Sequence, residues 1–372
     1  MTASRFSPLF VAVLLGAACA DRSPTAPLAE YSRINERGQD GRSEITVMAQ
    51  NLYVGADVDL VIGALRTPDP EDDIAALFFA IETLGKTAFP ARAELIADEI
   101  ARERPHAVGL QEVSNIDIDL RPVGAPFVVH LDFLAILQDA LTRRGLNYRL
   151  AAQVENIDAQ LLGGLVRLVD HDALLVDGDR VRVDAAAGQN FGLNVGEVAP
   201  GIILKRGWVS ARVSIGGAAY TLVSLHAEAN LAGASLDGLR AAQLGEIVAA
   251  VAPDERVILM GDFNDAPGSL MYEVVTGAGF TDVWRALRPG VVGNTCCHAG
   301  DLSDPVADLS QRIDYVFARG LGDGLRNTLF GKIDRFGEVP ADRVAGPAYR
   351  LWPSDHVGLV ATLQRSNGGG RR

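Results

Sequence analysis

The stretch Val257-Ile-Leu-Met-Gly-Asp-Phe-Asn-Asp265 is an apolar run that ends on a glycine, a carboxylate and an amide. Such a run predicts a buried strand. If the extended backbone continues through Phe263, the side chains of Asp262 and Asn264 point to one side while Phe263 turns back to the core. A carboxylate and an amide directed at one point can hold a divalent metal ion or an attacking water. A turn that merely ends the strand is the alternative interpretation of these residues alone.

The composition is that of an ordinary globular protein. Of 372 residues, 48% are hydrophobic and 22% are charged, which is enough for one large domain or two of average size. The net charge of −13 argues against tight, sequence-independent binding of nucleic acid, because that binding requires a basic surface. A small or lipid phosphate ester fits this charge better.

The N-terminus has the pattern of an export signal. Arg5 precedes the apolar run 9–15, which is too short to span a bilayer, and small residues lead to Cys19. We therefore interpret residues 1–19 as a signal that resembles a bacterial lipoprotein signal, with lipidated Cys19 as a membrane anchor. Cleavage by an ordinary signal peptidase is the alternative. Either way the protein is expected to be exported, as a periplasmic, membrane-anchored or secreted protein.

The remaining chain is expected to form one folded domain. Residues 20–43 contain prolines and glycines among polar residues and are predicted to be a flexible tether. The folded domain is predicted over 44–365 and a disordered tail over 366–372. No boundary signal divides the domain, so we expect one continuous core.

Helical and strand patterns alternate along this domain. Helices are predicted over 90–104, 131–144, 239–251 and 269–276. Strands are predicted over 45–51, 107–113, 148–154, 173–176, 181–185, 208–215, 220–226, 313–317 and 356–363, and from 257 onward. The short runs between 148 and 226 indicate an antiparallel meander. The mixture predicts an α/β or α+β layered fold.

Polar residues interrupt the ends of several predicted strands. They are Asn51, Glu112, His226, Asp314 and the pair Asp355-His356. Each one alone is as easily a hydrogen-bonded structural residue. Together they are hard to explain as separate accidents, because each would bury a costly polar group.

These motifs together resemble the endonuclease/exonuclease/phosphatase superfamily. They follow the family's order as Asn51, Leu110-Gln-Glu112, Leu225-His226, Gly261-Asp-Phe-Asn264, Arg312-Ile-Asp-Tyr315 and Ser354-Asp-His356. The resemblance covers about 45–363 and implies a four-layer α/β-sandwich, in which two central mixed sheets are flanked by helices. It also implies that 44–365 is the catalytic domain, with its site at one edge of the sheets.

The resemblance implies a metal site. Glu112 is the strongest candidate ligand for Mg²⁺, because a hard cation prefers carboxylate oxygen, and Mn²⁺ or Ca²⁺ would be bound by the same kind of ligand. Asn51 and Asp355 are expected to contact the metal ion directly or through water.

The catalytic roles follow from residue chemistry and agree with the resemblance. Asp314 is expected to fix the tautomer of His356 and to support its positive form. His356 either activates water or stabilises the transition state, and Asp262 is the other candidate to orient the water, so the base stays open. Asn264 and His226 are expected to donate hydrogen bonds to phosphoryl oxygens, and His226 is a candidate donor to the leaving oxygen.

Several further residues have weaker support. Arg240 and Gln243 occupy one helix face where family members often have an Arg/Gln pair, although a solvated helix face would look the same. The segment 170–172 precedes a predicted strand and offers an acidic partner for a histidine, with a loop role as the alternative. His298, in the loop 295–301, is a candidate for substrate selection. Cys296 and Cys297 are expected to form a bridge or to stay buried as thiols.

The leading functional hypothesis is an exported, Mg²⁺-dependent phosphoesterase that acts by in-line attack of an activated water on a small-molecule or lipid-headgroup phosphate ester. A secreted deoxyribonuclease-like endonuclease is the main alternative, and a non-catalytic surface binding module is the remote one. The protein is expected to act as a monomer.

Overall fold

The computed structural model describes residues 44–231, 233–322 and 329–364. The predicted export signal (1–19), the tether (20–43) and the tail (366–372) lie outside these residues. In the part of the chain that is described, no single helix is long and apolar enough to cross a membrane. The bent pair Glu71–Thr87 and Phe89–Glu103 passes that test of length and composition when its two helices are taken together.

The helices lie mostly in the first and third quarters of the chain. They are α1 Val58–Ala64, α2 Pro70–Thr87, α3 Phe89–Glu103, α4 Phe133–Arg143, α5 Asp237–Ala250, α6 Leu270–Gly277 and α7 Val283–Leu287. Side chains cap several N-termini as their sequences predict: Asp132 accepts a hydrogen bond from the Ala135 amide, and Ser269 accepts one from the Tyr272 amide.

The strands form two large sheets. The first sheet has the order β15-β18-β1-β2-β6-β3-β4, with β5 also paired to β6, and the second has the order β13-β14-β12-β11-β10-β7. The strands of the first sheet are β1 Glu44–Asn51, β2 Ala107–Gln111, β3 Asn115–Asp119, β4 Val128–Asp132, β5 Tyr148–Leu161, β6 Val166–Asp177, β15 Phe330–Phe336 and β18 Gly358–Gln364. Those of the second are β7 Arg182–Asn190, β10 Gly207–Ile215, β11 Ala218–His226, β12 Val257–Asp262, β13 Thr281–Asp282 and β14 Asp314–Arg319. Two short pairs stand apart, β8 Gly196–Ala199 with β9 Ile202–Leu204, and β16 Val344–Ala345 with β17 Arg350–Leu351.

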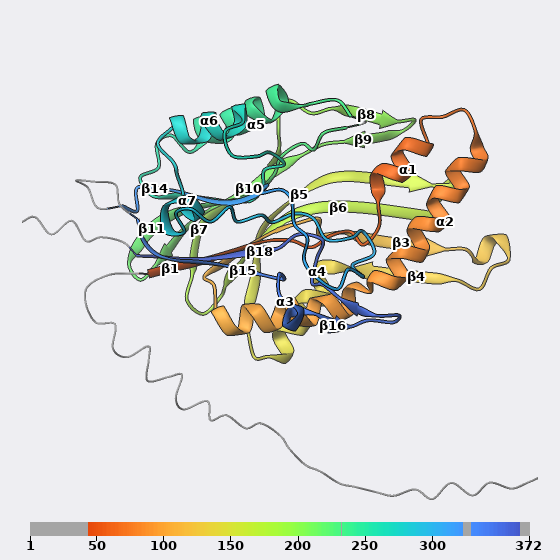
Figure 1. Cartoon of the computed structure of the whole chain (residues 1–372), viewed down its shortest axis with the longest axis horizontal. Helices are drawn as coiled ribbons and strands as arrows, with labels where there is room; N and C mark the ends of the chain where they lie inside the picture. The colour runs from red at the N-terminus through yellow and green to blue at the C-terminus, as the bar shows by residue number, and fades with distance from the viewer. Residues whose placement is uncertain (1–43, 232, 323–328, 365–372) are drawn as a thin grey trace, which may run out of the picture. The chain divides into compact units, whose positions relative to one another are not determined.

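Alternation along the strands produces four layers. In β1, Val47 faces the apolar core between the two sheets, whereas Met48 faces the core under α3 and α4. In β12, Ile258 faces the central core and Leu259 faces the core under α5 and α6. Each central strand is therefore buried on both faces, which explains its continuous apolar sequence. Figure 1 shows the resulting order, with α5 and α6 on one side of the sheets and α3 and α4 on the other. The predicted four-layer sandwich is confirmed.

The predicted meander is divided between the sheets. β5 and β6 pair in the first sheet, whereas β7, β10 and β11 pair in the second. All of these pairings are antiparallel, as predicted, but the segment between β6 and β7 crosses from one sheet to the other. A local sequence pattern specifies strands and turns, and it does not specify which of two facing sheets a strand joins.

Helices α1 and α2 were missed by the prediction from sequence. Asp69 caps α2 by accepting a hydrogen bond from the Glu71 amide, and a proline stands at the start of the helix. These start signals were visible in the sequence. Apolar residues of α2 also face solvent, since Phe78 and Phe79 are half exposed. The helix therefore has no single apolar stripe that marks its buried face.

The two sheets approach each other closely at Gly109 in β2. A Cβ atom there would lie 2.8 Å from the Ser224 hydroxyl of β11 and 2.9 Å from Cγ of Met260 in β12. Next to this contact, Gln111 donates a buried hydrogen bond of 2.9 Å across the sheets to the same hydroxyl. The spacing of the sheets near the ends of their central strands is thus fixed by the absence of a side chain.

We expect Gly109→Ala to destabilise the protein by about 1–3 kcal/mol, because a methyl group would overpack a dense interior. The free energy of unfolding can be measured by urea denaturation. Gly85→Ala is the matched control: Gly85 lies inside α2 with nothing near its Cβ position, so this substitution should stabilise the helix by about 0.5–1 kcal/mol. Equal stability of the two variants would contradict the close approach.

Candidate active site

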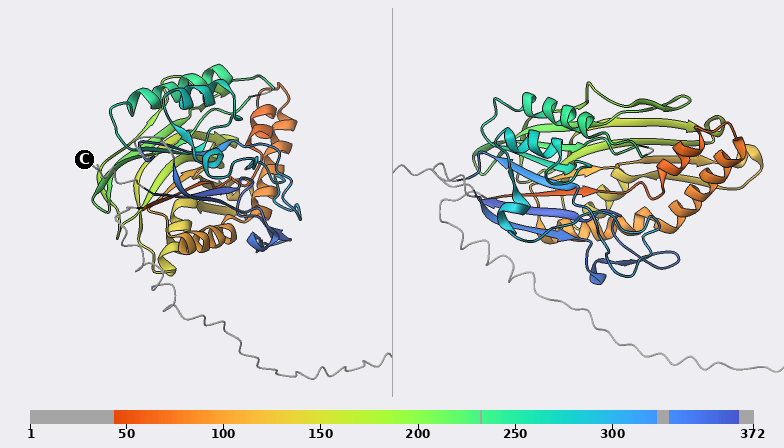
Figure 2. Two further views of the ribbon diagram at one scale, coloured as in Figure 1. Left: turned by 60° about the vertical axis from the view of Figure 1, so that its left-hand side comes forward. Right: turned by 45° about the horizontal axis from the view of Figure 1, so that its top comes forward.

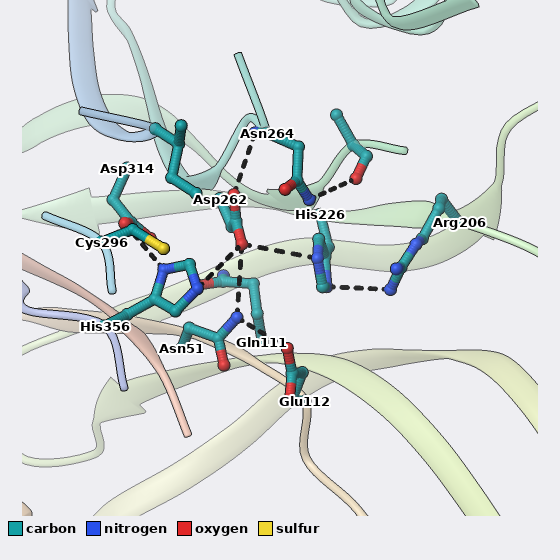
Figure 3. A network of polar contacts seen from close by, with 12 residues as sticks. Asn51, Gln111, Glu112, Arg206, His226, Asp262, Asn264, Cys296, Asp314 and His356 are labelled. Atoms are coloured by element: carbon teal, nitrogen blue, oxygen red, sulfur yellow. Dashed lines mark hydrogen bonds and ion pairs between the residues drawn. The ribbon is translucent and has the colours of Figure 1, made fainter. Parts of the chain in front are cut away.

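The strand register brings the predicted site residues to one edge of the sandwich. β1 and β2 run parallel with Asn51 opposite Gln111, and β11 and β12 run parallel with His226 opposite Asp262. β14 runs antiparallel to β12, so that its first residue, Asp314, lies opposite Asp262. Strand ends from both sheets therefore meet at this edge (Figure 3).

Asp262 lies at the centre of the cluster. Its Oδ2 atom accepts a hydrogen bond of 3.3 Å from the amide of Asn51, and it lies 3.5 Å from Nε2 of His226 and 3.8 Å from Nε2 of His356. Its Oδ1 atom accepts a hydrogen bond from the Asn264 backbone. This one carboxylate thus connects side chains from both sheets, as the dashed lines in Figure 3 show.

The predicted pair of His356 and Asp314 is present. Nδ1 of the imidazole lies 2.9 Å from Oδ2 of Asp314, and both side chains are buried. Burial lowers the pKa of His356, but the carboxylates of Asp314, Asp355 and Asp262 outweigh burial and raise this pKa well above its ordinary value. The geometry therefore favours an imidazolium at neutral pH.

Glu112 follows β2 directly and has a left-handed backbone (φ 55°), so the strand ends two residues earlier than predicted. Its oxygens accept hydrogen bonds from the Asn51 side chain at 3.0 Å and from the Val54 amide at 2.8 Å. Burial raises the pKa of Glu112, but the positive charges of His226 and His356 and these hydrogen bonds lower it overall. Glu112 is thus held as a carboxylate.

His226 ends β11 between charged neighbours. Nδ1 lies 3.2 Å from the Arg206 guanidinium and 3.7 Å from a carboxylate oxygen of Asp172. The latter is a charge contact, since it is too long for a hydrogen bond. Burial and Arg206 lower the pKa of His226, whereas Asp172 and Asp262 raise it, and the net direction is upward.

Asn264 reaches the site by a different geometry from that predicted. β12 ends at Asp262, and Asn264 has a left-handed backbone with φ 53°. Its amide nitrogen donates to the Ala227 carbonyl at 3.0 Å, which fixes the side-chain orientation and leaves one amide hydrogen available. Phe263 is fully buried against α5 and α6, as predicted.

A cavity of about 340 Å³ opens over this cluster. Its charged and polar lining is mostly acidic: the carboxylates come from Asp57, Asp59, Glu112, Asp170, Asp262 and Asp355, and the other groups include Arg206, His226, Asn264 and His356. Asn51 and Asp314 lie behind this lining and position the residues in front. Six carboxyl groups against two histidines and one arginine make the cavity acidic, and a bound cation would offset this negative charge.

The three proposed substrate-binding residues lie away from the cavity lining. Arg240 and Gln243 are buried, so the alternative of a solvated helix face is wrong. Arg240 bonds Asp265 and the Glu228 carbonyl, and Gln243 bonds the Glu228 amide, so both residues hold the loops that follow β11 and β12. Through these contacts, Arg240 and Gln243 position the loops that carry site residues.

His298 is likewise occupied by protein groups. Its Nδ1 atom bonds Asp304 at 2.9 Å, its Nε2 atom lies 2.8 Å from the Gly337 carbonyl, and its ring stacks on Trp352. From the same loop, Gly300 lies at the cavity, whereas the His298 side chain is bonded to protein groups. The neighbouring cysteines 296 and 297 are joined as a disulfide beside His356.

The segment 170–172, which was predicted to precede a strand, lies within one. Asp170 and Asp172 belong to β6, so the alternative interpretation as a loop is wrong. Asp170 lines the cavity and accepts a hydrogen bond from Ser114, whereas both oxygens of buried Asp172 lack a hydrogen-bond partner. Burial together with the charges of Asp172 and Glu112 raises the pKa of Asp170 to about 7.

Two arginines that shape the site have no signal in the sequence. Arg206 stands alone between β9 and β10, yet it contacts both His226 and Glu228. Arg92 is fully buried in α3 and donates to the carbonyls of Leu52 and Tyr53 and to that of Pro353, next to the Ser354-Asp355-His356 segment. Arg92 ties together the loops that deliver Tyr53 and Asp355.

The family model described as the Endonuclease/Exonuclease/phosphatase family matches residues 83–356. The chain belongs to this family. Its members hydrolyse phosphate esters and include nucleases, and they usually depend on a divalent metal ion. The match covers most of the sites described above, from α3 to His356. Among proteins of curated function, none matches the chain.

Solved structures of the same family share the fold. The family protein from Beutenbergia cavernae has a TM-score of 0.54 at 19% identity, over 88% of this chain and 73% of that chain. The protein from Bacteroides thetaiotaomicron has a TM-score of 0.53 at 16% identity, over 87% and 99%. TDP2 of D. rerio, solved with a single-strand DNA product, has a TM-score of 0.52 at 18% identity, over 86% and 99%. At these identities the similarity shows the fold alone.

The residues present fit a divalent metal ion. Glu112 and Asp355 both line the cavity, and the negative charge of Glu112 raises the pKa of Asp355. No lysine is among the described residues that line the cavity. Carboxylate oxygens are the ligands that Mg²⁺ and Mn²⁺ prefer. Asn51 bonds Glu112 and thereby orients this ligand. A second acidic group, formed by Asp262, Asp314 and His356, lies within the same cluster.

We expect Asp314→Asn to lower the pKa of His356 by about one to three pH units, because the imidazolium loses its nearest anion. The raised pKa means that this ion pair contributes stability below the ordinary histidine pKa, and that this stability is lost as pH rises through the raised value. Titration of the six histidines by NMR measures the change.

Asp304→Asn is the matched control, because it removes the carboxylate partner of another buried histidine, His298. It should leave the pKa of His356 unchanged. An Asp314→Asn variant in which His356 titrates as in the native protein would contradict the assigned pair.

Proposed function

We propose that the protein is an exported, Mg²⁺-dependent hydrolase of a small-molecule or lipid-headgroup phosphate ester. The observation that carries this proposal is the convergence on Asp262 of Asn51, His226 and His356, beneath a cavity lined by carboxylates. This arrangement offers both an acceptor that orients a water and donors for a phosphoryl group.

The attacking water is oriented by Asp262. Its Oδ2 atom faces the cavity and has no closer partner than the Asn51 amide, so a water can donate a hydrogen bond to it. The oxygen of this water forms the new bond to phosphorus while the bond to the leaving oxygen breaks in line. His356, held as an imidazolium by Asp314, stabilises the charge that builds on the phosphoryl oxygens.

Donors on the other side of Asp262 complete the site. The available amide hydrogen of Asn264 and the protonated ring of His226 both face the cavity. His226 gives a proton to the leaving oxygen, and Arg206 and Asp172 set the position of its ring. This assigns His226 as the general acid and Asp262 as the group that accepts the proton of the water.

The metal ion would be held by Glu112 and Asp355, with Asn51 orienting Glu112. When bound, it neutralises charge on the phosphoryl oxygens as a Lewis acid. Burial and the charge of Glu112 raise the pKa of Asp355 to about 7, against the opposing charges of His356 and Arg92. Without a cation, the Asp355 carboxyl group is thus partly protonated near neutral pH.

We therefore expect Mg²⁺ binding to release protons and to weaken as pH falls below about 7, because the metal competes with the proton on Asp355. Calorimetric titration in two buffers of different ionisation enthalpy counts the released protons. Asp355→Asn should abolish most of this release and weaken binding. Binding with equal affinity at pH 6 and pH 8 would contradict Asp355 as a ligand.

The lining disfavours a polymeric substrate. A nucleic acid brings many phosphates, whereas this cavity presents six carboxylates and one arginine, and the chain has a net charge of −13. A substrate with one phosphate group needs only the metal ion and the donors beside it. The likeness to TDP2 with its DNA product is one of fold, so the nuclease stays the alternative.

The test is hydrolysis of a substrate panel by the full chain with and without Mg²⁺. The panel contains bis-p-nitrophenyl phosphate, p-nitrophenyl phosphate, plasmid DNA, sphingomyelin and inositol phosphates. His356→Ala and Glu112→Gln should each reduce kcat by at least about a hundredfold, because each removes charge stabilisation or a metal ligand. His130→Ala is the matched control, since this exposed histidine of β4 should be dispensable.

Salt distinguishes the two enzyme hypotheses. Turnover of a small ester should change little between 50 and 200 mM salt, whereas cleavage of DNA should fall steeply by the loss of counterion release. Cleavage of plasmid DNA alone would replace the proposal with the nuclease. A folded protein that binds Mg²⁺ but hydrolyses nothing would support the binding module.

A further inference from the structure

A second cavity, of about 90 Å³, lies beside the catalytic one and is wholly apolar. Helices α1 and α2 form one wall, and strands β3, β5 and β6 form the other. Every lining side chain is aliphatic: the helices contribute Val58, Val61, Ile62, Leu77, Ala80, Ile81 and Leu84, and the strands contribute Ile116, Ile118, Ile157, Ala159, Leu161, Val166 and Leu168.

The two cavities share a boundary. Residues that line both are Val54, Ala56, Val58, Ile62, Ile157 and Leu168. The backbone amide of Val54 donates the 2.8 Å hydrogen bond to Glu112, so the apolar space begins one residue from the proposed metal ligand. The apolar cavity is therefore adjacent to the place where a phosphate at the catalytic site would carry its organic group.

An apolar space of this size is not expected in a core without a use. Protein interiors are packed as densely as organic crystals, and voids larger than a water molecule are few. A cavity lined by aliphatic side chains stays dry, since water finds no hydrogen-bond partner there, and it can bind a hydrocarbon. The cavity thus favours methylene groups over the hydroxyl-rich groups of a sugar or inositol.

The outer face of the same wall is also apolar. Ile74, Phe78 and Phe79 on α2 are 45%, 52% and 54% exposed, so α2 presents apolar side chains to solvent as well as to the cavity. Both views in Figure 2 show α1 and α2 side by side along one flank of the sheets. Contact with a hydrocarbon phase would bury these side chains, and contact with a polyanion would not.

We propose that this apolar cavity is the subsite for a hydrocarbon chain of the substrate, which makes the substrate a lipid-like phosphate ester. The inference rests on the proposed phosphoesterase activity and narrows it to one substrate class. The phosphate lies at Asp262 and the metal site, and the first methylene groups of the chain pass Val54 and Ile62 into the cavity. The remainder of a long chain lies along α2.

The experiment uses p-nitrophenyl alkyl phosphodiesters from methyl to hexyl, at concentrations below their aggregation, with the full chain. Each methylene group that enters the cavity should raise kcat/KM by about fourfold, as expected for burial of a methylene. The increase should level off when the cavity is full. A flat dependence on chain length, with the methyl ester hydrolysed, would overturn the inference and leave the phosphoesterase proposal intact.

Ala80→Leu fills the cavity from α2, and Ala75→Leu makes the same change on the exposed face of that helix. Ala80→Leu should lose the gain in kcat/KM with chain length, because its side chain occupies the cavity. Ala75→Leu should keep this gain and hydrolyse the methyl ester at the native rate. A gain that survives Ala80→Leu would overturn the assignment of the cavity, and Ala159→Leu fills it from β5 if Ala80→Leu does not fold.

A measurement of binding tests the apolar subsite independently of catalysis. Calorimetry with methyl to hexyl phosphate in the presence of Mg²⁺ should show Kd falling by about fourfold per methylene in the native chain and staying flat in Ala80→Leu. This result without turnover of any ester would refute the proposed activity and support the subsite. Equal affinities for all chain lengths would refute the subsite, whatever the activity.

Discussion

The structure depends on the position of one carboxylate, Asp262. It ends the central strand of the second sheet, yet its nearest polar neighbours include Asn51 at the end of a central strand of the first. Besides the buried hydrogen bond between Gln111 and Ser224, this contact joins the two sheets through polar groups at one edge. The buried carboxylate is tolerated because Asn51, the Asn264 backbone and two histidines surround it.

The charged groups around Asp262 shift one another's pKa values in ways that favour cationic histidines and neutral carboxyl groups. His226 and His356 are held towards their protonated forms by acidic neighbours, while Asp170 and Asp355 resist ionisation because they are buried near other carboxylates. Groups pushed in opposite directions within one cavity are typical of sites that move protons. Stability alone would favour fewer buried charges, so the arrangement is better explained by chemistry than by folding.

The sequence predicted the strand ends well, because apolar runs that stop on Asn51, His226 or Asp262 leave few other interpretations. It also predicted the four layers, through the family resemblance. It could not predict Arg206 or Arg92, since a single arginine has no periodicity, and their roles come from contacts between distant segments. Helices α1 and α2 could not be predicted as readily, because their apolar side chains face the apolar cavity and solvent as well as the packed core. The cavity between these helices and the first sheet could not be predicted without them.

The close approach at Gly109 has a consequence for the reaction. Gly109 lies in β2 and Glu112 follows that strand directly, while the atoms that a Cβ at Gly109 would approach belong to β11 and β12, the strands that end in His226 and Asp262. The thickness of the interior at this point therefore sets the distance between the two halves of the site. The separation of the two sheets beneath the site therefore depends on Gly109 having no side chain.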